Sequence, residues 1–187
     1  MELKKRLLAV GGIHTFENLM PCRLLHAEPE GSIKNLNWED TLALEALREG
    51  TVDLACGAEV LSLDIVLPDR LVIEIVSDAN PTNLQVLDRF KVQVRLYDSR
   101  GRELEVGKFT NIQWFFSSIF EIASDTSAGE FGYCDTCYGM QDFRALKPGK
   151  GSIEASFGGV RGTLFFVTSG NSEIRELPGE SNDQDKG

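Results

Sequence analysis

The sequence predicts an all-β protein, an antiparallel sandwich or barrel, on two observations. Between residues 71 and 168, short segments alternate apolar and polar residues, and Gly, Pro, Asp or Asn bounds each segment. A β-strand points successive side chains to opposite faces, so this alternation places one face in a core and the other in water. No segment between them shows the helical period over roughly ten residues that a βαβ fold requires.

The clearest strand is expected over residues 90–97. Its apolar side chains share one face and are predicted to line the core: Phe90, Val92, Val94 and Leu96. Residues 98–101 then supply turn chemistry, because Asp and Ser favour turns and Gly101 adopts positive φ without strain. Residues 102–106 are expected to return as a short hairpin partner.

Further short strands follow at regular spacing. They are expected over residues 71–75, 84–87, 112–116, 141–146, 153–157 and 162–168. Trp114 is expected on a central strand, where it would pack in the core. Phe115 and Phe116 are adjacent and therefore point to opposite faces.

An internal repeat indicates a related unit before this region. Ala46-Leu47-x-x-Gly50 recurs 99 residues later as Ala145-Leu146-x-x-Gly149. In both places an alternating segment and then an apolar strand follow, so residues 42–67 are interpreted as the last three strands of a preceding domain. A helix over residues 37–50, with an Asn cap and a Gly stop, remains the alternative.

The predicted organisation is a partial or divergent β domain over residues 1–68, a complete sandwich over 69–169 and a disordered acidic tail over 170–187. Further strands of the first domain are expected within residues 3–10, 22–27 and 32–36. Fewer than about 70 residues is a marginal size for an independent core, so the first domain is expected to depend on docking to its neighbour.

Charge and hydropathy exclude several classes of protein. The formal net charge is −10, which repels phosphates and argues against a nucleic-acid partner. No apolar stretch reaches the roughly 18 residues that a membrane-spanning helix needs, so no direct membrane insertion is expected. The apolar run of residues 7–10 is too short for the core of a signal peptide. The localisation stays open at this point.

Residues 71–168 resemble the bacterial immunoglobulin-like group 2 domain, and residues 42–67 resemble it more loosely. The segments that carry the resemblance are Pro68-x-Arg70-Leu71, Leu84-Gln85-Val86, Val94 to Gly101, Ile112-x-Trp114, Ala145 to Gly149 and Ile153-x-Ala155. The immunoglobulin-like lumenal repeats of the nuclear pore membrane glycoprotein share the pattern. There too, a segment like residues 96–102 leads through a Phe, here Phe109, to Ile-Gln-Trp.

The resemblance implies an immunoglobulin-like antiparallel β-sandwich and a non-enzymatic structural or interaction module. Its partners would be proteins, either neighbouring immunoglobulin-like domains or a second copy. The pore-glycoprotein family implies a lumenal setting at the nuclear envelope. A bacterial surface-adhesion or phage-virion module is the alternative within the same fold, and it implies an extracellular or virion setting. The fold alone does not decide among these roles.

Cys134 and Cys137 form the sharpest local motif. A Cys-x-x-Cys pair serves in half of a zinc site, a redox couple or a disulfide. Zinc would need Cys22 and His26 from the other domain, and a redox couple needs a helix N-terminus that this predicted loop lacks. The pair is therefore interpreted as a loop disulfide or as two inert thiols, and no metal or cofactor is expected.

Exposed aromatic side chains are the candidate partner surface. Phe115 and Phe165 are expected to point outward from neighbouring strands, where they would form an apolar patch typical of an interface. Tyr133 and Tyr138 lie in the predicted loop around the cysteines. Aromatic residues beside polar loop residues are also typical of a carbohydrate-binding accessory domain, which is the alternative from another functional class.

The sequence holds no pattern that predicts catalysis. Paired carboxylates such as Glu103 and Glu105 lie among hydrophilic neighbours, as on a solvated face. Phosphate-binding glycine motifs are absent, and a catalytic triad would have to draw on His14 or His26 in the least regular segment. A non-enzymatic role is therefore expected.

Overall fold

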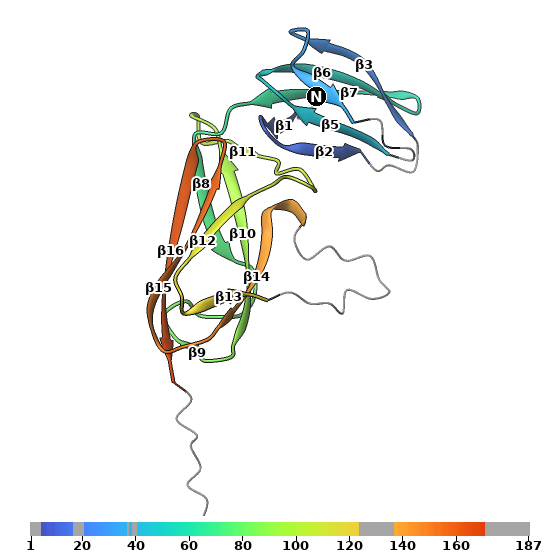
Figure 1. Cartoon of the computed structure of the whole chain (residues 1–187). Coiled ribbons are helices and arrows are strands. Elements are labelled where there is room, and N and C mark those ends of the chain that lie inside the picture. Colours follow the sequence, from blue (N-terminus) through green and yellow to red (C-terminus); the bar gives the residue numbers. More distant parts are fainter. Residues whose placement is uncertain (1–4, 17–20, 37, 39–40, 124–136, 171–187) are drawn as a thin grey trace, which may run out of the picture.

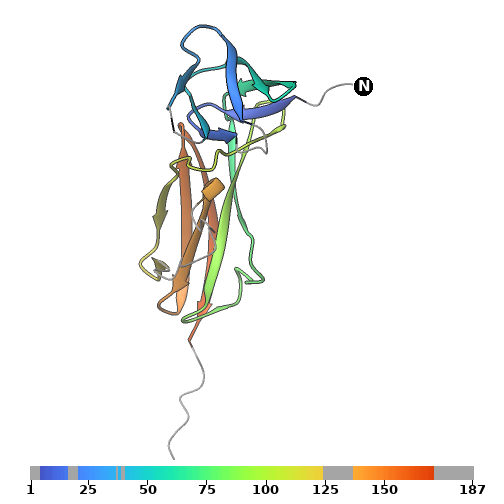
Figure 2. The same ribbon diagram turned by 90° about the vertical axis from the view of Figure 1, so that its right-hand side faces the viewer.

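A computed structural model of the chain describes residues 5–16, 21–36, 38, 41–123 and 137–170. These residues form an all-β structure of two sandwiches, the N-terminal one lying across one end of the C-terminal one (Figures 1 and 2). The C-terminal end of the last strand lies at the pole far from the N-terminal sandwich (Figure 1). The predicted all-β class is confirmed.

The N-terminal sandwich has two sheets. Its strands are β1 (Arg6–Ala9), β2 (Ile13–Phe16), β3 (Cys22–Glu28), β4 (Ile33–Asn35), β5 (Leu42–Ala46), β6 (Gly50–Cys56) and β7 (Glu59–Val66). One sheet has the order β1-β7-β6-β3 and the other the order β2-β5-β4. β1 runs parallel to β7, whereas the other neighbours within each sheet are antiparallel.

The C-terminal sandwich also has two sheets. Its elements are β8 (Arg70–Ile75), β9 (Leu84–Gln85), β10 (Arg89–Tyr97), β11 (Glu103–Leu104), β12 (Gln113–Phe116), β13 (Phe120–Ile122), the short 3-10 turn η1 (Cys137–Gly139), β14 (Met140–Ala145), β15 (Gly149–Phe157) and β16 (Val160–Ser169). β8, β10, β14 and β13 form one sheet, to which β11 is added, and β12, β15, β16 and β9 form the other.

The strand order of the C-terminal sandwich is that of an immunoglobulin-like domain. Strands A, B, E and D of that fold form one sheet and strands C, F and G the other. β8, β10, β14 and β13 occupy the first set of positions, and β12, β15 and β16 occupy the second. β9 adds a parallel strand beside the last one. This order of strands identifies the C-terminal sandwich as immunoglobulin-like.

The described part of the N-terminal sandwich repeats this order without counterparts of β8 and β11. The sheet β1-β7-β6-β3 corresponds to β9-β16-β15-β12, and β2-β5-β4 corresponds to β10-β14-β13. The repeat predicted around residues 46 and 145 is real in three dimensions: Ala46 and Ala145 are both buried at the end of equivalent strands, β5 and β14. The helix considered over residues 37–50 does not form in the described part of this range, where β5 spans Leu42–Ala46 and β6 begins at Gly50.

Alternating side chains build the core of the C-terminal sandwich. Phe90, Val92, Val94 and Leu96 of β10 are at most 2% exposed, as the period of two predicts. The Phe90 ring packs on Phe143 from its own sheet and on Phe166 from the opposite sheet. The aromatic cluster therefore joins the two layers.

Turn residues fix the register of the neighbouring strands. Gly158 and Gly159 both have positive φ between Phe157 and Val160, which pair directly, so they form the two-residue hairpin that twisted strands favour. In the β10–β11 connection, the buried Asp98 carboxylate accepts hydrogen bonds from the amides of Arg100 and Arg102. The predicted turn over residues 98–101 is thus confirmed.

Two strands and one position differ from the prediction. β2 and β13 were not expected; they have four and three residues, too few to show a clear period. Trp114 was expected on a central strand, yet β12 is the edge strand of its sheet. Its side chain is only half-buried and contacts Phe143 edge to face.

Candidate functional site: the joint between the sandwiches and the exposed aromatic side chains

The first strand of the chain belongs to both cores. Leu8 of β1 lies in the core of the N-terminal sandwich, whereas Leu7 and Ala9, which point the other way, pack against the core of the C-terminal sandwich. Val66 at the end of β7 packs against the same C-terminal core. We call this contact region the joint. Because the joint buries apolar side chains from both sides, it resists relative movement of the sandwiches.

Backbone hydrogen bonds also cross the joint. The segment after β11 forms an isolated parallel bridge between Glu105 and Leu8. The Glu105 amide donates to the Leu7 carbonyl at 2.7 Å, and the Ala9 amide donates to the Glu105 carbonyl at 3.3 Å. A sheet-like connection therefore links the two sandwiches in addition to the covalent link at residues 67–69.

An ion pair lies over this bridge. Arg6 donates to both carboxylate oxygens of Glu105, from Nε at 2.9 Å and from a terminal nitrogen at 2.7 Å. These hydrogen bonds raise the pKa of Arg6. The guanidinium also lies over the Phe16 ring, 5.3 Å from its centre. Two-point pairing fixes direction as well as distance, so the pair orients β1 on the C-terminal sandwich.

The backbones approach closely beside this pair. A Cβ atom at Gly107 would lie 1.9 Å from the carbonyl oxygen of Ile13, which no side chain tolerates. The Thr110 hydroxyl accepts a hydrogen bond from the Ile13 amide at 3.2 Å. Glycine at position 107 is therefore required for β2 to dock.

A buried histidine lies in the same region. His14 is 3% exposed, and its Nε2 lies 3.1 Å from the Ala9 carbonyl oxygen, to which the neutral ring donates. Burial lowers the pKa of His14 below its ordinary value, although the hydrogen bond to Ala9 and the charge of Glu105 oppose this effect. The joint thus contains a group whose protonation is unfavourable in the folded protein.

Two exposed aromatic residues meet across the joint. Trp38 of the N-terminal sandwich contacts Phe109 of the C-terminal sandwich edge to face, with ring centres 5.2 Å apart. Both side chains remain more than 40% exposed. Neither residue was predicted as a site, because neither lies in an alternating segment.

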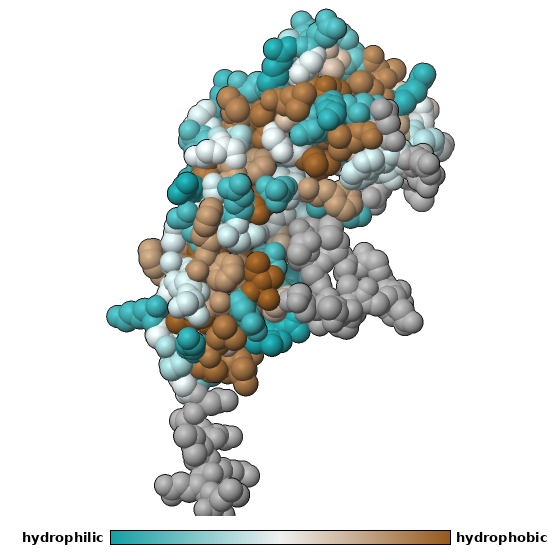
Figure 3. All heavy atoms as spheres, in the orientation of Figure 1, coloured by the Kyte–Doolittle hydropathy of each residue, from teal (hydrophilic) through white to brown (hydrophobic). Residues whose placement is uncertain are grey.

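The predicted aromatic surface is divided. Phe115 and Phe165 point outward and are 51% and 74% exposed. They do not lie on neighbouring strands, because β15 separates β12 from β16 and places Glu154 opposite Phe115. On the face drawn in Figure 3, several separate hydrophobic patches lie over the C-terminal sandwich. The expectation of adjacent strands was wrong because residue spacing does not reveal the order of strands.

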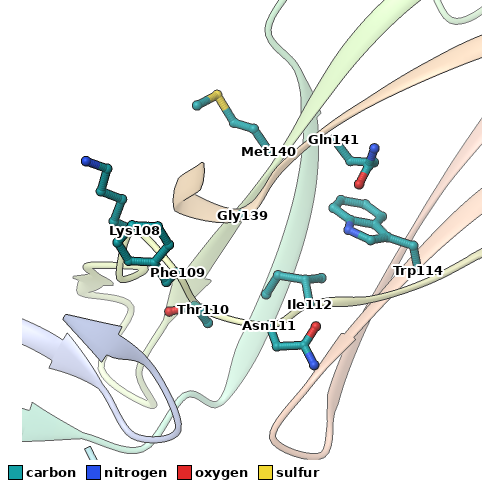
Figure 4. A pocket seen from close by; sticks show the side chains of 9 residues that line it. All are labelled: Lys108, Phe109, Thr110, Asn111, Ile112, Trp114, Gly139, Met140 and Gln141. Carbon is teal, nitrogen blue, oxygen red and sulfur yellow. The ribbon is translucent and has the colours of Figure 1, made fainter. Parts of the chain in front are cut away.

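A small cavity opens beside Trp114. Its volume is about 260 Å³, and its wall is formed by Lys108, Phe109, Thr110, Asn111, Ile112, Trp114, Gly139, Met140 and Gln141 (Figure 4). The Trp114 ring and the Gln141 amide face one another from opposite sheets (Figure 4). Sites for small organic ligands usually measure roughly 300–1,000 Å³, so this cavity is smaller than a typical binding site.

Tyr138 contributes to a second cavity. The residue is 47% exposed and lines a hollow of about 450 Å³ along β10 and β11. The charged side chains that line this hollow all have partners. Arg95 pairs with Glu103 and with Glu74, and Glu105 pairs with Arg6. Such paired groups offer little to a charged ligand.

The cysteines divide into two pairs. Cys22 and Cys56 occupy directly opposite positions on β3 and β6 and form a disulfide. This pairing was not predicted: Cys22 was considered only as a remote zinc ligand, since nothing in the spacing shows that β3 and β6 pair. Tyr133, Cys134 and the side chain of Cys137 lie outside the described residues. The Cys134–Cys137 pair therefore stays a prediction.

The described residues contain neither a metal-binding cluster nor a membrane-spanning helix. No group of three or more His, Cys, Asp or Glu within them is arranged to hold a metal ion. Over the same residues, no helix has the length and apolar character needed to cross a membrane.

Comparisons with known proteins supply no family for this chain. No family model matches the chain, and no curated protein matches it. Among solved structures, domains 5–6 of the S-layer protein SbsC are 12% identical, with 91% of this chain and 96% of that one covered and a TM-score of 0.38. The Escherichia coli adhesin FdeC is 14% identical, with 88% and 62% covered and a TM-score of 0.38.

An I-band fragment of titin is similar at 8% identity, with 90% of this chain and 62% of that fragment covered and a TM-score of 0.34. At TM-scores this low, the strand order described above remains the basis for the assignment of the fold.

Proposed function

We propose that the chain is a non-enzymatic structural module: two immunoglobulin-like domains, over residues 1–68 and 69–169, held at a fixed angle as a spacer within a larger protein assembly. Residues 170–187 would form a polar tail beyond the second domain. The observation that carries this proposal is the joint, where β1 contributes side chains to both cores and Arg6 pairs with Glu105.

A rigid joint is what a spacer requires and what an independent pair of domains lacks. Interfaces between domains of one chain are commonly polar and permit relative motion. Here apolar burial, a backbone bridge and the close approach of Gly107 to Ile13 act together. Partners would be proteins, either neighbouring immunoglobulin-like domains or a second copy of the chain.

The disulfide supports an oxidising compartment. Disulfides persist in secreted, extracellular and lumenal proteins and are rare in the cytosol. The Cys22–Cys56 bridge therefore agrees with the lumenal setting that the resemblance to the nuclear pore membrane glycoprotein implies, and equally with a bacterial or virion surface module. A test of compartment is peptide mapping of the protein from its native source without reductant.

The experiment that tests the spacer role measures the relative orientation of the sandwiches in solution. Residual dipolar couplings of the whole chain are expected to fit one alignment tensor for both sandwiches. Gly107→Ala is expected to split the couplings into two tensors, because the added Cβ would overlap the Ile13 carbonyl. Gly170→Ala, where nothing lies within 4 Å of the added Cβ, is the matched control. Two independent tensors in the wild-type chain would refute the proposal.

A further inference from the structure

The spacer role leaves the free edge of β12 unexplained. Among the described strands, β12 pairs with β15 on one side and with none on the other. From residue 109 to residue 120 the chain has no charged side chain. Exposed edge strands bind other strands readily, and natural proteins usually protect them with Lys, Pro or a bulge. β12 contains no such residue.

The hydrogen bonds of β12 show which backbone groups face this edge. The Ser117 amide donates to the Ser152 carbonyl of β15 at 3.0 Å. Backbone groups of an antiparallel strand alternate in direction, so those of Phe115 also face β15. The N–H and C=O groups of Trp114 and Phe116 therefore point to the free edge. They form a donor and acceptor pattern that a second antiparallel strand can complete.

We propose that β12 pairs with β12 of a second copy of this chain, antiparallel and about a two-fold axis at Phe115. In this register Trp114 of each copy lies opposite Phe116 of the other, and each such pair exchanges two backbone hydrogen bonds. A register centred on Trp114 would instead require Ile112, which is 9% exposed and belongs to the core. Within β12 alone, the register centred on Phe115 forms two hydrogen-bonded pairs, whereas the register centred on Trp114 forms one.

The side chains fit a second copy. The two Phe115 rings, each 51% exposed, meet directly at a non-hydrogen-bonded position, where opposing side chains are closest. Trp114 and the 39% exposed Phe116 meet on the inner face. No charged side chain is buried in any of these pairs. The long-range repulsion between two copies of net charge −10 is screened by salt, so association is expected to strengthen with ionic strength.

The pairing deepens the proposed function and rests on it, since it gives the spacer its partner. The two copies would join their four-stranded sheets into one continuous sheet, with the N-terminal sandwiches at opposite ends. The orientation measurement above reports on a single copy, so failure of the spacer role and failure of the pairing give separate results.

Sedimentation equilibrium of the full chain over a concentration series tests the pairing. Wild-type protein is expected to form a dimer that tightens with added salt. Phe115→Lys places two like charges opposite each other at the axis and is expected to weaken the dimer about tenfold or more. Phe165→Lys, on the outer face of the same sheet but away from this edge, is the matched control and is expected to dimerise like the wild type.

A cross-link tests the register. Opposed non-hydrogen-bonded positions lie at a distance that a disulfide spans. Phe115→Cys is therefore expected to form a disulfide-linked dimer under mild oxidation, identified by mass spectrometry of the peptide linked to itself, whereas Phe165→Cys is not. A wild-type chain that stays monomeric, a dimer unaffected by Phe115→Lys, or equal cross-linking at both positions would overturn the proposal.

Discussion

Arg6 and Glu105 lie 99 positions apart in the sequence and meet through two parallel hydrogen bonds. Arg6 belongs to the first strand of the N-terminal sandwich, and Glu105 follows β11 of the C-terminal sandwich. The contact therefore ties the first described strand of the chain to the end of the second sandwich that forms the joint. Both side chains are about 40% exposed, so their attraction is partly screened by water.

The energetic coupling of this pair is expected to be modest but measurable. A double-mutant cycle with Arg6→Ala and Glu105→Ala should give about 0.5–1 kcal/mol in the free energy of unfolding, since two-point geometry adds to a partly exposed pair. The control is Arg161 and Glu154, a single contact at 3.4 Å whose Arg is 67% exposed. Urea denaturation of the four variants of each cycle measures both couplings. Equal coupling energies in the two cycles would contradict the expectation that two-point hydrogen bonding strengthens the pair of Arg6 and Glu105.

Stability is expected to fall in mild acid because of His14. The pKa of His14 is lowered by burial in the folded protein, so below the ordinary pKa of about 6.5 the unfolded chain binds a proton that the folded chain does not. The stability that neutral His14 contributes is fully present above that pH. It is lost as the pH falls through the lowered pKa that His14 has in the folded protein. His14→Gln keeps a donor for the Ala9 carbonyl but cannot titrate.

Urea denaturation at pH values from about 8 to about 5 checks this prediction, because this range brackets the pKa of an ordinary histidine. The wild type should lose more stability than His14→Gln as the pH falls. His26→Gln, at an exposed position on β3, should follow the wild type. Parallel curves for the wild type and His14→Gln would show that His14 does not titrate on unfolding.

The disulfide is expected to stabilise the N-terminal sandwich. Cys22 and Cys56 are 34 positions apart, and closing a loop of that length in the unfolded chain corresponds to about 3–4 kcal/mol. The double variant with Cys22→Ala and Cys56→Ala should lose this amount in urea denaturation. Reductant should lower the stability of the wild type in the same way and leave that of the variant sandwich unchanged. Unlinked Cys22 and Cys56 peptides in a non-reducing digest would contradict the pairing.

Replacement of a core phenylalanine by alanine is expected to cost much more stability than replacement of a surface phenylalanine. Phe90 is 2% exposed and contacts Phe120, Phe143 and Phe166, so Phe90→Ala should cost about 3–5 kcal/mol through the cavity that it leaves. Phe165 is 74% exposed, and Phe165→Ala should change the free energy of unfolding by no more than about 0.5 kcal/mol. Thermal and urea denaturation measure both. A comparable loss in the two variants would mean that the two side chains are buried to a similar extent.

Much of the fold was predictable because it depends on local patterns. Alternation identified β10 and β15, and the Ala-Leu-x-x-Gly repeat identified β5 to β7 as strands, since the period of two and the turn residues are local properties. β13 was missed because three residues carry no period. The place of Trp114 was missed because whether a strand is central or at an edge depends on pairing far along the chain.

The candidate site was predicted less well for the same reason. Phe115 and Phe165 were selected as outward residues, which local alternation decides, but their separation by β15 is a long-range property. Docking of the first domain on its neighbour was expected from its small size, but the residues of the joint were not predicted, since Arg6, Glu105 and Gly107 have no distinctive sequence context. The Cys22–Cys56 bridge similarly requires the register of β3 on β6.

The parallel pairing of β1 with β7 has a mechanical consequence. Arg6 to Ala9 lie beside Leu63 to Val66 in the same direction, and the chain enters and leaves the N-terminal sandwich through these two strands. Tension applied along the chain therefore slides the strands past each other and loads their hydrogen bonds together, instead of opening them one after another. Under stretching, this sandwich is arranged to hold as a unit until the whole strand pair gives way.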